Sequence, residues 1–259
     1  MAVNLPSGDP EFMASLAKGL AVLQCFSERE RPMTITEASH LTGLSRAATR
    51  RCLYTLAHLG FVSQTEFGYS LRPKVLALGY AYLSSSSLSF RAQPILDQLR
   101  DELHESCSLG VLDEDEVYYV ARAESSRIIA SLLRIGSRLP LYPTSVGRVL
   151  LASQPVGEQQ AYFKRVKPQR LTEHSVTEAS QLLKILRTIA EEGFALVDQE
   201  LEVGLRSVAV PITVNRRVVA AINVTAPANR VPIAELRTCY VKALRKAARD
   251  VELMARMPA

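Results

Sequence analysis

The 259-residue chain contains no tryptophan and only four cysteines, Cys25, Cys52, Cys107 and Cys239. The cysteines form no C-x-x-C pair and have no histidine at ligand spacing, so neither a zinc site nor a disulfide framework is predicted. The chain also lacks a run of about 18 apolar residues and a charged start followed by an apolar stretch. We therefore expect a reduced, cytoplasmic protein that neither spans a membrane nor is exported.

Sequence motifs of the common hydrolases and nucleotide-binding enzymes are missing as well. There is no G-x-S-x-G, no H-E-x-x-H and no glycine-rich phosphate loop, and the four histidines are isolated from one another. The acidic run at residues 113–116 is interpreted as a charged β-turn rather than a cation site. No catalytic residue, metal site or cofactor is expected. A hydrolase stays open as an alternative because serine, histidine and aspartate are all present; Ser145→Ala would then abolish turnover of an aryl ester or acid.

Basic residues exceed acidic ones, 31 against 26, for a net charge of +5. Most of the basic residues are arginines, which bind phosphate and carboxylate in a planar, bidentate way. Residues 14–80 hold eight basic side chains against four acidic ones, a large share of the whole excess. This balance permits an anionic partner such as nucleic acid, and it places that partner at the N-terminal part of the chain.

Hydrophobic periodicity predicts three helices and a hairpin in residues 13–73. The first helix covers residues 14–26, and the second begins at Thr36 as N-cap and ends at Gly43. The third begins at Ser45 and ends at Gly60. Two short β-type runs at residues 61–64 and 67–71 follow and form a hairpin. Helix, helix, turn, helix and hairpin in this order are typical of a winged helix-turn-helix.

The third helix is the candidate DNA-reading element. At 100° per residue its leucines share one side, while Arg46, Arg50 and Arg51 fall on the other. Guanidinium groups beside a helix N-terminus match the phosphates and the guanine edges of a major groove, and Tyr69 on the hairpin is placed to contact the neighbouring backbone. The alternative is an ordinary solvated helix face. The predicted DNA-binding residues are Thr36, Ser45, Arg46, Ala47, Thr49, Arg50, Arg51 and Tyr69.

The rest of the chain is predicted to be a linker and a larger α+β domain. Residues 74–90 contain a linker helix and the serine run at 84–87, where we place the domain boundary. Residues 91–257 alternate short strands with helices in a pattern that favours an antiparallel sheet flanked by helices. Strands are expected at 107–112, 117–121, 128–133, 194–197, 207–214 and 218–224, and helices at 94–104, 145–153, 177–192 and from about 232 onward. Residues 1–12 are aperiodic and are expected to be a tag remnant.

The run SLAKGLAVLQCFSERERPMTITEASHLTGLSRAATRRCLYTLAHLGFV resembles the N-terminal domain of the IclR family of bacterial transcription regulators. The stretches YVARAESSRIIASLLRIGSRLPLYPTSVGRVLLA and GFALVDQELEVGLRSVAVPI resemble the family's effector-binding domain. The resemblance extends over nearly everything from Met13 on, and it is closest to the branch that controls protocatechuate, β-ketoadipate and 4-hydroxybenzoate catabolism. It implies a GAF-like C-terminal domain, a double-stranded DNA operator, a homodimer or dimer of dimers, and no catalysis.

The resemblance also implies an effector pocket in the second domain. A polar turn entering the helix at residue 145 offers free amides and a helix dipole to an anion, and the residue alternation along the last strand directs Asn223 and Thr225 inward. Arg134 and Arg148 are candidates to neutralise an aromatic or dicarboxylic acid, although surface salt bridges are equally compatible with both. Ser207 stands where many relatives carry cysteine, so the effector's identity stays open. The predicted effector-binding residues are Arg134, Thr144, Ser145, Gly147, Arg148, Asp198, Leu205, Ser207, Asn223 and Thr225.

A third alternative is a protein without a ligand, whose amphipathic helices only dock onto partners. Such a protein would show no thermal shift with any metabolite.

Overall fold

The computed structural model describes residues 9–26, 31–85, 87–125 and 133–256. The chain divides into two compact units, Met1–Tyr82 and Leu83–Ala259. The division falls beside the serine run at residues 84–87.

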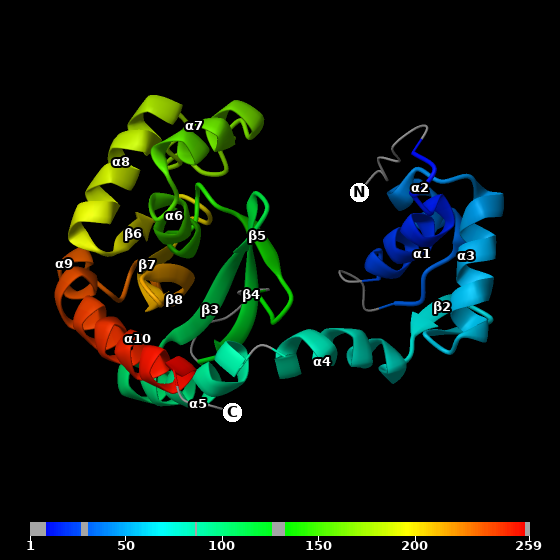
Figure 1. The fold of residues 1–259 in the computed structure, drawn as a ribbon, viewed down its shortest axis with the longest axis horizontal. Helices are drawn as coiled ribbons and strands as arrows, with labels where there is room; N and C mark the ends of the chain where they lie inside the picture. The colour runs from blue at the N-terminus through cyan, green and yellow to red at the C-terminus, as the bar shows by residue number, and fades with distance from the viewer. Residues whose placement is uncertain (1–8, 27–30, 86, 126–132, 257–259) are drawn as a thin grey trace. The chain divides into compact units, whose positions relative to one another are not determined.

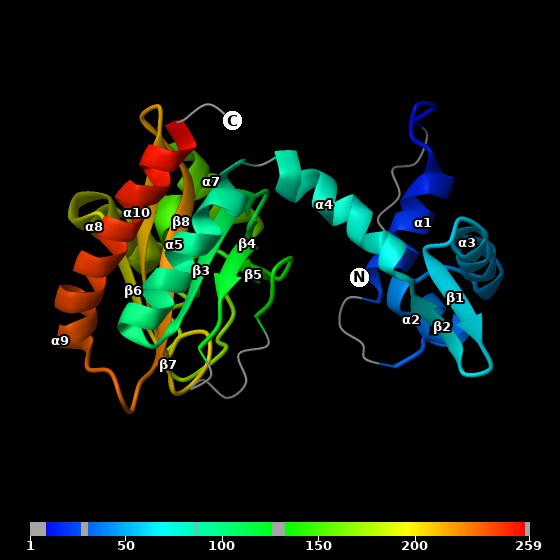
Figure 2. The same cartoon turned by 90° about the horizontal axis from the view of Figure 1, so that it is seen from below.

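The N-terminal unit has the order of elements that the sequence predicts (Figures 1 and 2). Three helices, α1 (Ala14–Gln24), α2 (Ile35–Thr42) and α3 (Arg46–His58), precede an antiparallel hairpin of β1 (Val62–Thr65) and β2 (Gly68–Leu71). A 3-10 turn, Pro73–Val75, and helix α4 (Leu76–Ser85) follow. The core between these elements is made by Val22, Phe26, Met33, Ala38, Leu53, Leu56, Val62 and Tyr69. This unit is a winged helix-turn-helix.

The turn between α2 and α3 is set by two local signals. Gly43 ends α2 with a left-handed φ of 70°, a backbone conformation that glycine adopts without strain. Ser45 then caps α3, and its hydroxyl accepts a hydrogen bond from the Ala48 amide. Both residues were predicted in these roles.

The predicted cap of α2 was wrong by two residues. Thr34, not Thr36, is the N-cap: its hydroxyl accepts from the Glu37 amide, and the Glu37 carboxylate accepts from the Thr34 amide. This is a reciprocal capping box, which satisfies two amides that a helix start otherwise leaves unpaired. Thr36 therefore lies inside the first turn, where its side chain is available to α3.

Replacing Thr34 with alanine removes one half of this capping box. We expect the free energy of unfolding of the isolated N-terminal unit to fall by about 1 kcal/mol. Denaturant unfolding of that unit measures the change. Thr36→Ala serves as the matched control, since Thr36 caps no helix, and an equal loss in both variants would contradict the assignment.

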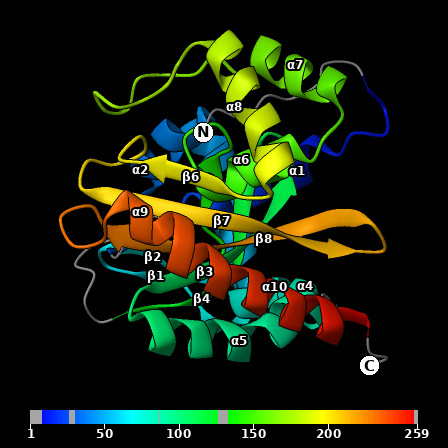
Figure 3. The same cartoon turned by 90° about the vertical axis from the view of Figure 1, so that its left-hand side faces the viewer.

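The C-terminal unit is built on one six-stranded antiparallel sheet in the order β5-β4-β3-β8-β7-β6. The strands are β3 (Ser106–Asp113), β4 (Glu116–Ala123), β5 (Arg138–Pro140), β6 (Ala195–Asp198), β7 (Leu205–Val214) and β8 (Arg217–Pro227). Figure 3 shows the sheet between two helical layers. One layer holds α5 (Ser87–Leu103) and α10 (Val241–Arg256); the other holds α6 (Ser145–Ala152), α7 (Val156–Arg165) and α8 (Ala179–Glu192). The predicted α+β class is confirmed.

Residue alternation along the strands separates two cores. In β8, Ile222 and Val224 pack toward α5 and α10, whereas Ala221 packs toward α6 and α8. The pairing of β3 with β4 shifts register between Leu109 and Gly110, and this shift changes which β4 residues face α6 and α8. Beyond that shift Ala121 and Ala123 join the α5 and α10 core, so the residue between them lies on the α6 face.

Several elements differ from the sequence prediction. Helix α7 and the edge strand β5 were not predicted, and α5 begins at Ser87 and carries Pro94 within it. The terminal helix is interrupted: α9 (Ile233–Glu235) leads into a π-helical turn, Leu236–Tyr240, before α10. Of the strand expected at residues 128–133, residues 128–132 lie outside the described part. The acidic run at 113–116 is the β3–β4 turn, with Glu114 at a φ of 52°.

Candidate functional site

Helix α3 presents a continuous polar face on the N-terminal unit. Arg46, Ala47, Arg50 and Arg51 are exposed, and so is Tyr54, of which 71% is accessible. The guanidinium of Arg46 donates to the Thr36 hydroxyl at 2.8 Å, which fixes this side chain beside the helix N-terminus. Within the described ranges, no ion pair involves any of the three arginines.

Two of the predicted DNA-binding residues face the interior. Thr49 is fully buried, and its hydroxyl donates to the Ser45 carbonyl at 3.1 Å. Tyr69 is 6% exposed and belongs to the hydrophobic core, while its backbone pairs with Met33. These two predictions were wrong, because Thr49 lies on the core side of α3 and Tyr69 on the core side of the wing. Phe67, at the hairpin tip, is 71% exposed instead.

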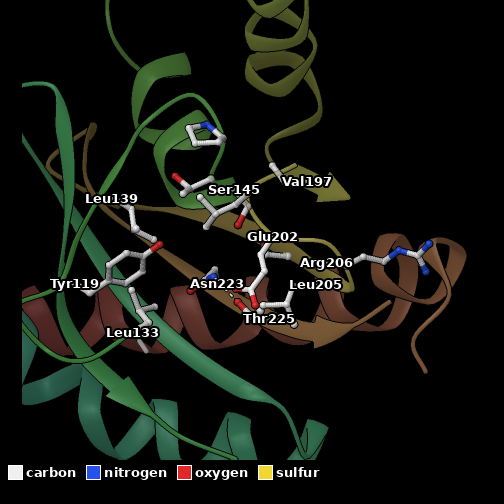
Figure 4. Close-up of a pocket in the computed structure, with 14 residues that line it drawn as sticks. Tyr119, Leu133, Leu139, Ser145, Val197, Glu202, Leu205, Arg206, Asn223 and Thr225 are labelled. Carbon is white, nitrogen blue, oxygen red and sulfur yellow. Dashed lines mark hydrogen bonds between the residues drawn. The ribbon is translucent and has the colours of Figure 1, made fainter. Parts of the chain in front are cut away.

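A cavity of about 70 Å³ opens on the α6 face of the sheet (Figure 4). This volume is several times the ~10–15 Å³ that holds one water molecule. Six of the predicted effector-binding residues line it: Thr144, Ser145, Leu205, Ser207, Asn223 and Thr225. The sequence did not indicate the other lining residues, Tyr119, Leu133, Leu139, Pro143, Val197, Leu201, Glu202 and Arg206.

Three buried polar groups give the cavity its chemistry. The amide of Asn223 donates to the Thr225 hydroxyl at 3.3 Å. The carbonyl oxygen of Asn223 and the hydroxyl of Ser145 have no hydrogen-bond partner among the described residues, although Asn223 is 3% and Ser145 1% exposed. Burial raises the pKa of the Tyr119 phenol, which keeps it neutral. Leucine and valine side chains form the remaining walls, a composition typical of small-molecule sites.

The start of α6 keeps part of the free amides that the sequence suggested: those of Ser145 and Val146 have no hydrogen-bond partner among the described residues, whereas that of Gly147 is taken. Thr144 caps the helix by accepting from the Gly147 amide at 3.1 Å, and its carbonyl accepts from the Arg148 amide. A Cβ at position 147 would lie 2.3 Å from the Leu141 carbonyl oxygen, so Gly147 permits close backbone packing. Gly147 is absent from the cavity wall and its amide is held by Thr144, so its predicted role in anion binding stays a prediction without support from these contacts.

Arg148 is also engaged elsewhere. It is 2% exposed, and its two terminal nitrogens donate to the Glu200 carboxylate at 2.7 and 2.6 Å. Its Nε donates to the Tyr142 carbonyl, and Glu200 accepts in addition from the Val176 amide. The prediction that Arg148 neutralises an effector was wrong, because this buried bidentate pair already holds the guanidinium.

The two remaining predicted charges lie outside the cavity wall. Arg134 is exposed and does not line the cavity. Asp198 pairs with Arg206, whose guanidinium also donates to the Ala228 and Val231 carbonyls. Figure 4 shows the Arg206 guanidinium directed away from the other lining residues. None of these charges is placed to meet a ligand's carboxylate.

The arrangement defines a regulator with a DNA-reading unit and a separate ligand-sensing unit. The IclR helix-turn-helix domain matches residues 15–66, and the bacterial transcriptional regulator IclR C-terminal domain matches residues 80–253. The chain belongs to the IclR family of bacterial transcriptional regulators.

Related proteins extend this match over nearly the whole chain. The Pca regulon regulatory protein of Pseudomonas putida is 44% identical, over 95% of this chain and 85% of its own. The p-hydroxybenzoate hydroxylase transcriptional activator of Acinetobacter baylyi is 34% identical, over 85% and 84%. The crystal structure of an IclR homolog from Microbacterium hydrocarbonoxydans, 23% identical, shares the fold with a TM-score of 0.83 over 94% of this chain and 99% of that one.

Two features are absent from the described residues. None of their helices is long and apolar enough to cross a membrane. No group of three or more histidine, cysteine, aspartate or glutamate side chains in them is placed to hold a metal ion.

Proposed function

We propose that this chain regulates genes of aromatic acid catabolism, binding operator DNA through α3 and an organic acid in the cavity on the α6 face. The observation that carries the proposal is the unpaired arginine face of α3 on a winged helix-turn-helix. The names of the two relatives, a Pca regulon regulator and a p-hydroxybenzoate hydroxylase activator, support the aromatic pathway.

DNA recognition follows from the α3 geometry. Arg46, Arg50 and Arg51 share a solvent face with Ala47, whose small side chain allows the helix to lie close to the bases. A guanidinium reads guanine by two parallel hydrogen bonds in the major groove and otherwise anchors on phosphates. The Thr36 hydroxyl holds the Arg46 side chain in place and reduces the entropy lost on binding.

Effector binding follows from the cavity. Its apolar walls accommodate a hydrocarbon body, and the unpartnered Asn223 carbonyl oxygen is a buried acceptor suited to a ligand hydroxyl. A hydroxylated aromatic acid such as protocatechuate or 4-hydroxybenzoate combines these two features. Binding of the acid changes the affinity for DNA only if the acid binds two conformations of the protein with different affinities.

Calorimetry with the full-length chain tests the effector class. We expect saturable binding of protocatechuate or 4-hydroxybenzoate, and weaker binding of benzoate, which lacks the hydroxyl donor. Asn223→Leu should remove this preference for the hydroxylated acid, since it removes the acceptor. If no aromatic or ring-cleavage acid binds, the proposed effector class is wrong. The hydrolase alternative would gain support only from turnover that Ser145→Ala abolishes.

Dimerisation is the proposed assembly of the N-terminal unit. Large apolar side chains are exposed on α1 and α4, with Leu16 at 57%, Leu76 at 73% and Tyr80 at 70% accessible. Large exposed apolar side chains on α1 and on α4 are candidates for an association surface, and pairing two units matches the two half-sites of a palindromic operator.

Charges placed on this surface should dissociate the dimer. For Leu76→Glu combined with Tyr80→Glu, we expect the dimer dissociation constant to rise at least tenfold, about 1.4 kcal/mol. Sedimentation equilibrium measures the constant, and Val156→Glu on α7 is the control because it adds the same charge at a 66% exposed apolar position. An unchanged constant would place the interface elsewhere.

A further inference from the structure

The cavity face of the sheet carries a buried arginine that the sequence did not single out. Arg122 lies on β4, and its side chain is 6% exposed. It faces α6 rather than α5, because the flanking residues Ala121 and Ala123 belong to the opposite core. Burial lowers the pKa of the Arg122 guanidinium, and an arginine in this setting still keeps its charge.

Strand register places Arg122 on the face of the sheet that carries the cavity, two strands from Asn223, although Arg122 does not itself line the cavity wall. Arg122 pairs with Ser108 on β3, and Ser108 pairs in turn with Asn223 on β8, which lines the cavity. Directly paired side chains lie on the same face of a sheet. The Arg122 Nη1 donates to the Ser108 hydroxyl at 3.0 Å, which places this end of the guanidinium at β3, the strand between β4 and β8. About one strand spacing, ~5 Å, then separates it from Asn223.

The guanidinium is incompletely paired. Its Nε and Nη2 are buried and have no hydrogen-bond partner among the described residues. Nη2 forms a long ion pair with the Glu124 carboxylate, at 3.7 Å, on a side chain that is 63% exposed. This distance exceeds the ~2.7–2.9 Å of a charge-assisted hydrogen bond. A buried cation with two unused donors is costly to maintain unless a ligand supplies the acceptors.

We infer that Arg122 binds the carboxylate of the effector, through Nε and Nη2, just beyond the β4 side of the cavity. This assignment rests on the proposed function, in which the cavity binds an organic acid. Nε and Nη2 form one edge of the planar guanidinium, the fork that receives both oxygens of a carboxylate. The acid's apolar body then extends along the sheet over Asn223 and Thr225, toward β7. Arg122 therefore takes the role that Arg134 and Arg148 do not fill.

A matched pair of ligands tests the assignment on the full-length chain by calorimetry. The probes are 4-hydroxybenzoate and 4-hydroxybenzamide, which share size and hydroxyl group but differ in charge. We expect the wild type to prefer the acid by at least 30-fold and Arg122→Met to bind the two within threefold of each other. Arg122→Lys, which keeps the charge and loses the fork, should fall between them. Arg187→Met, an exposed arginine on α8, is the control and should leave the preference intact.

Stability separates a binding role from a structural one. If Arg122 serves the ligand, Arg122→Met without ligand should melt no lower than the wild type, while the thermal shift caused by 4-hydroxybenzoate disappears. A lower melting temperature together with a retained preference for the acid would overturn the assignment and leave the proposed function standing. If the wild type binds neither 4-hydroxybenzoate nor protocatechuate, the effector class of the proposed function fails, and this assignment fails with it.

Discussion

Replacing Glu200 with alanine is expected to lower the free energy of unfolding of the chain by about 3–5 kcal/mol. The substitution leaves the Arg148 guanidinium, 2% exposed, without the carboxylate that accepts two of its hydrogen bonds. It also removes the acceptor of the Val176 amide, which ties the segment before α8 to the loop that carries Glu200. Urea unfolding followed by circular dichroism measures the loss.

The double variant Arg148→Met with Glu200→Leu is the matched control. Removing both charges eliminates the unpaired cation, so most of the lost stability should return. Arg165→Met provides a second comparison, because its pair with Asp115 is 54% exposed on the arginine side and solvent screening leaves it little effect on stability. If Glu200→Ala costs no more than Arg165→Met, Arg148 and Glu200 do not stabilise the domain as the geometry indicates.

Replacing Arg50 with alanine is expected to weaken operator binding by about 1–3 kcal/mol and to relax the preference at one base pair. Arg50 lies in the middle of the exposed α3 face, and no described carboxylate competes for it. Fluorescence anisotropy with DNA duplexes that differ at single base pairs, at one fixed salt concentration, measures both effects.

The pattern of the loss identifies the contact. A loss confined to one base pair shows direct reading, whereas an equal loss on every duplex shows a phosphate contact. Arg187→Ala on α8 changes the net charge equally and should leave the affinity within experimental error. If Arg50→Ala, Arg46→Ala and Arg51→Ala all bind as the wild type does, α3 is not the DNA-reading helix.

The N-terminal fold follows from short-range signals, and those are readable in a sequence. Gly43, Ser45 and the leucines of α3 fix the turn and the orientation of that helix. Side-chain orientation was misassigned at two positions. Thr49 precedes Leu53 and Leu56 by four and seven residues, so helical periodicity itself places it on their buried side of α3. Tyr69 is buried because the hairpin packs its backbone against Met33, a tertiary contact that the sequence pattern does not reveal.

The effector site was only partly predictable for a different reason. Lining residues on regular strands, such as Asn223 and Thr225, follow from two-residue alternation. Arg148 was assigned wrongly because its partner Glu200 is 52 residues away in the sequence and meets it only in the fold. Arg122 and Tyr119 were missed because they are three residues apart, and simple alternation would put them on opposite faces of the sheet. The register shift between β3 and β4 puts both on the α6 face, and such shifts leave no clear sequence signal.

The most direct test joins both units of the chain in one titration. Full-length protein is added to a labelled palindromic duplex from upstream of the genes adjacent to its own, with and without saturating protocatechuate or 4-hydroxybenzoate. The proposed function predicts sequence-specific, salt-dependent binding whose dissociation constant changes by about 5- to 150-fold when the acid is present. Binding that ignores the DNA sequence, or that is identical with and without every acid tested, would contradict it.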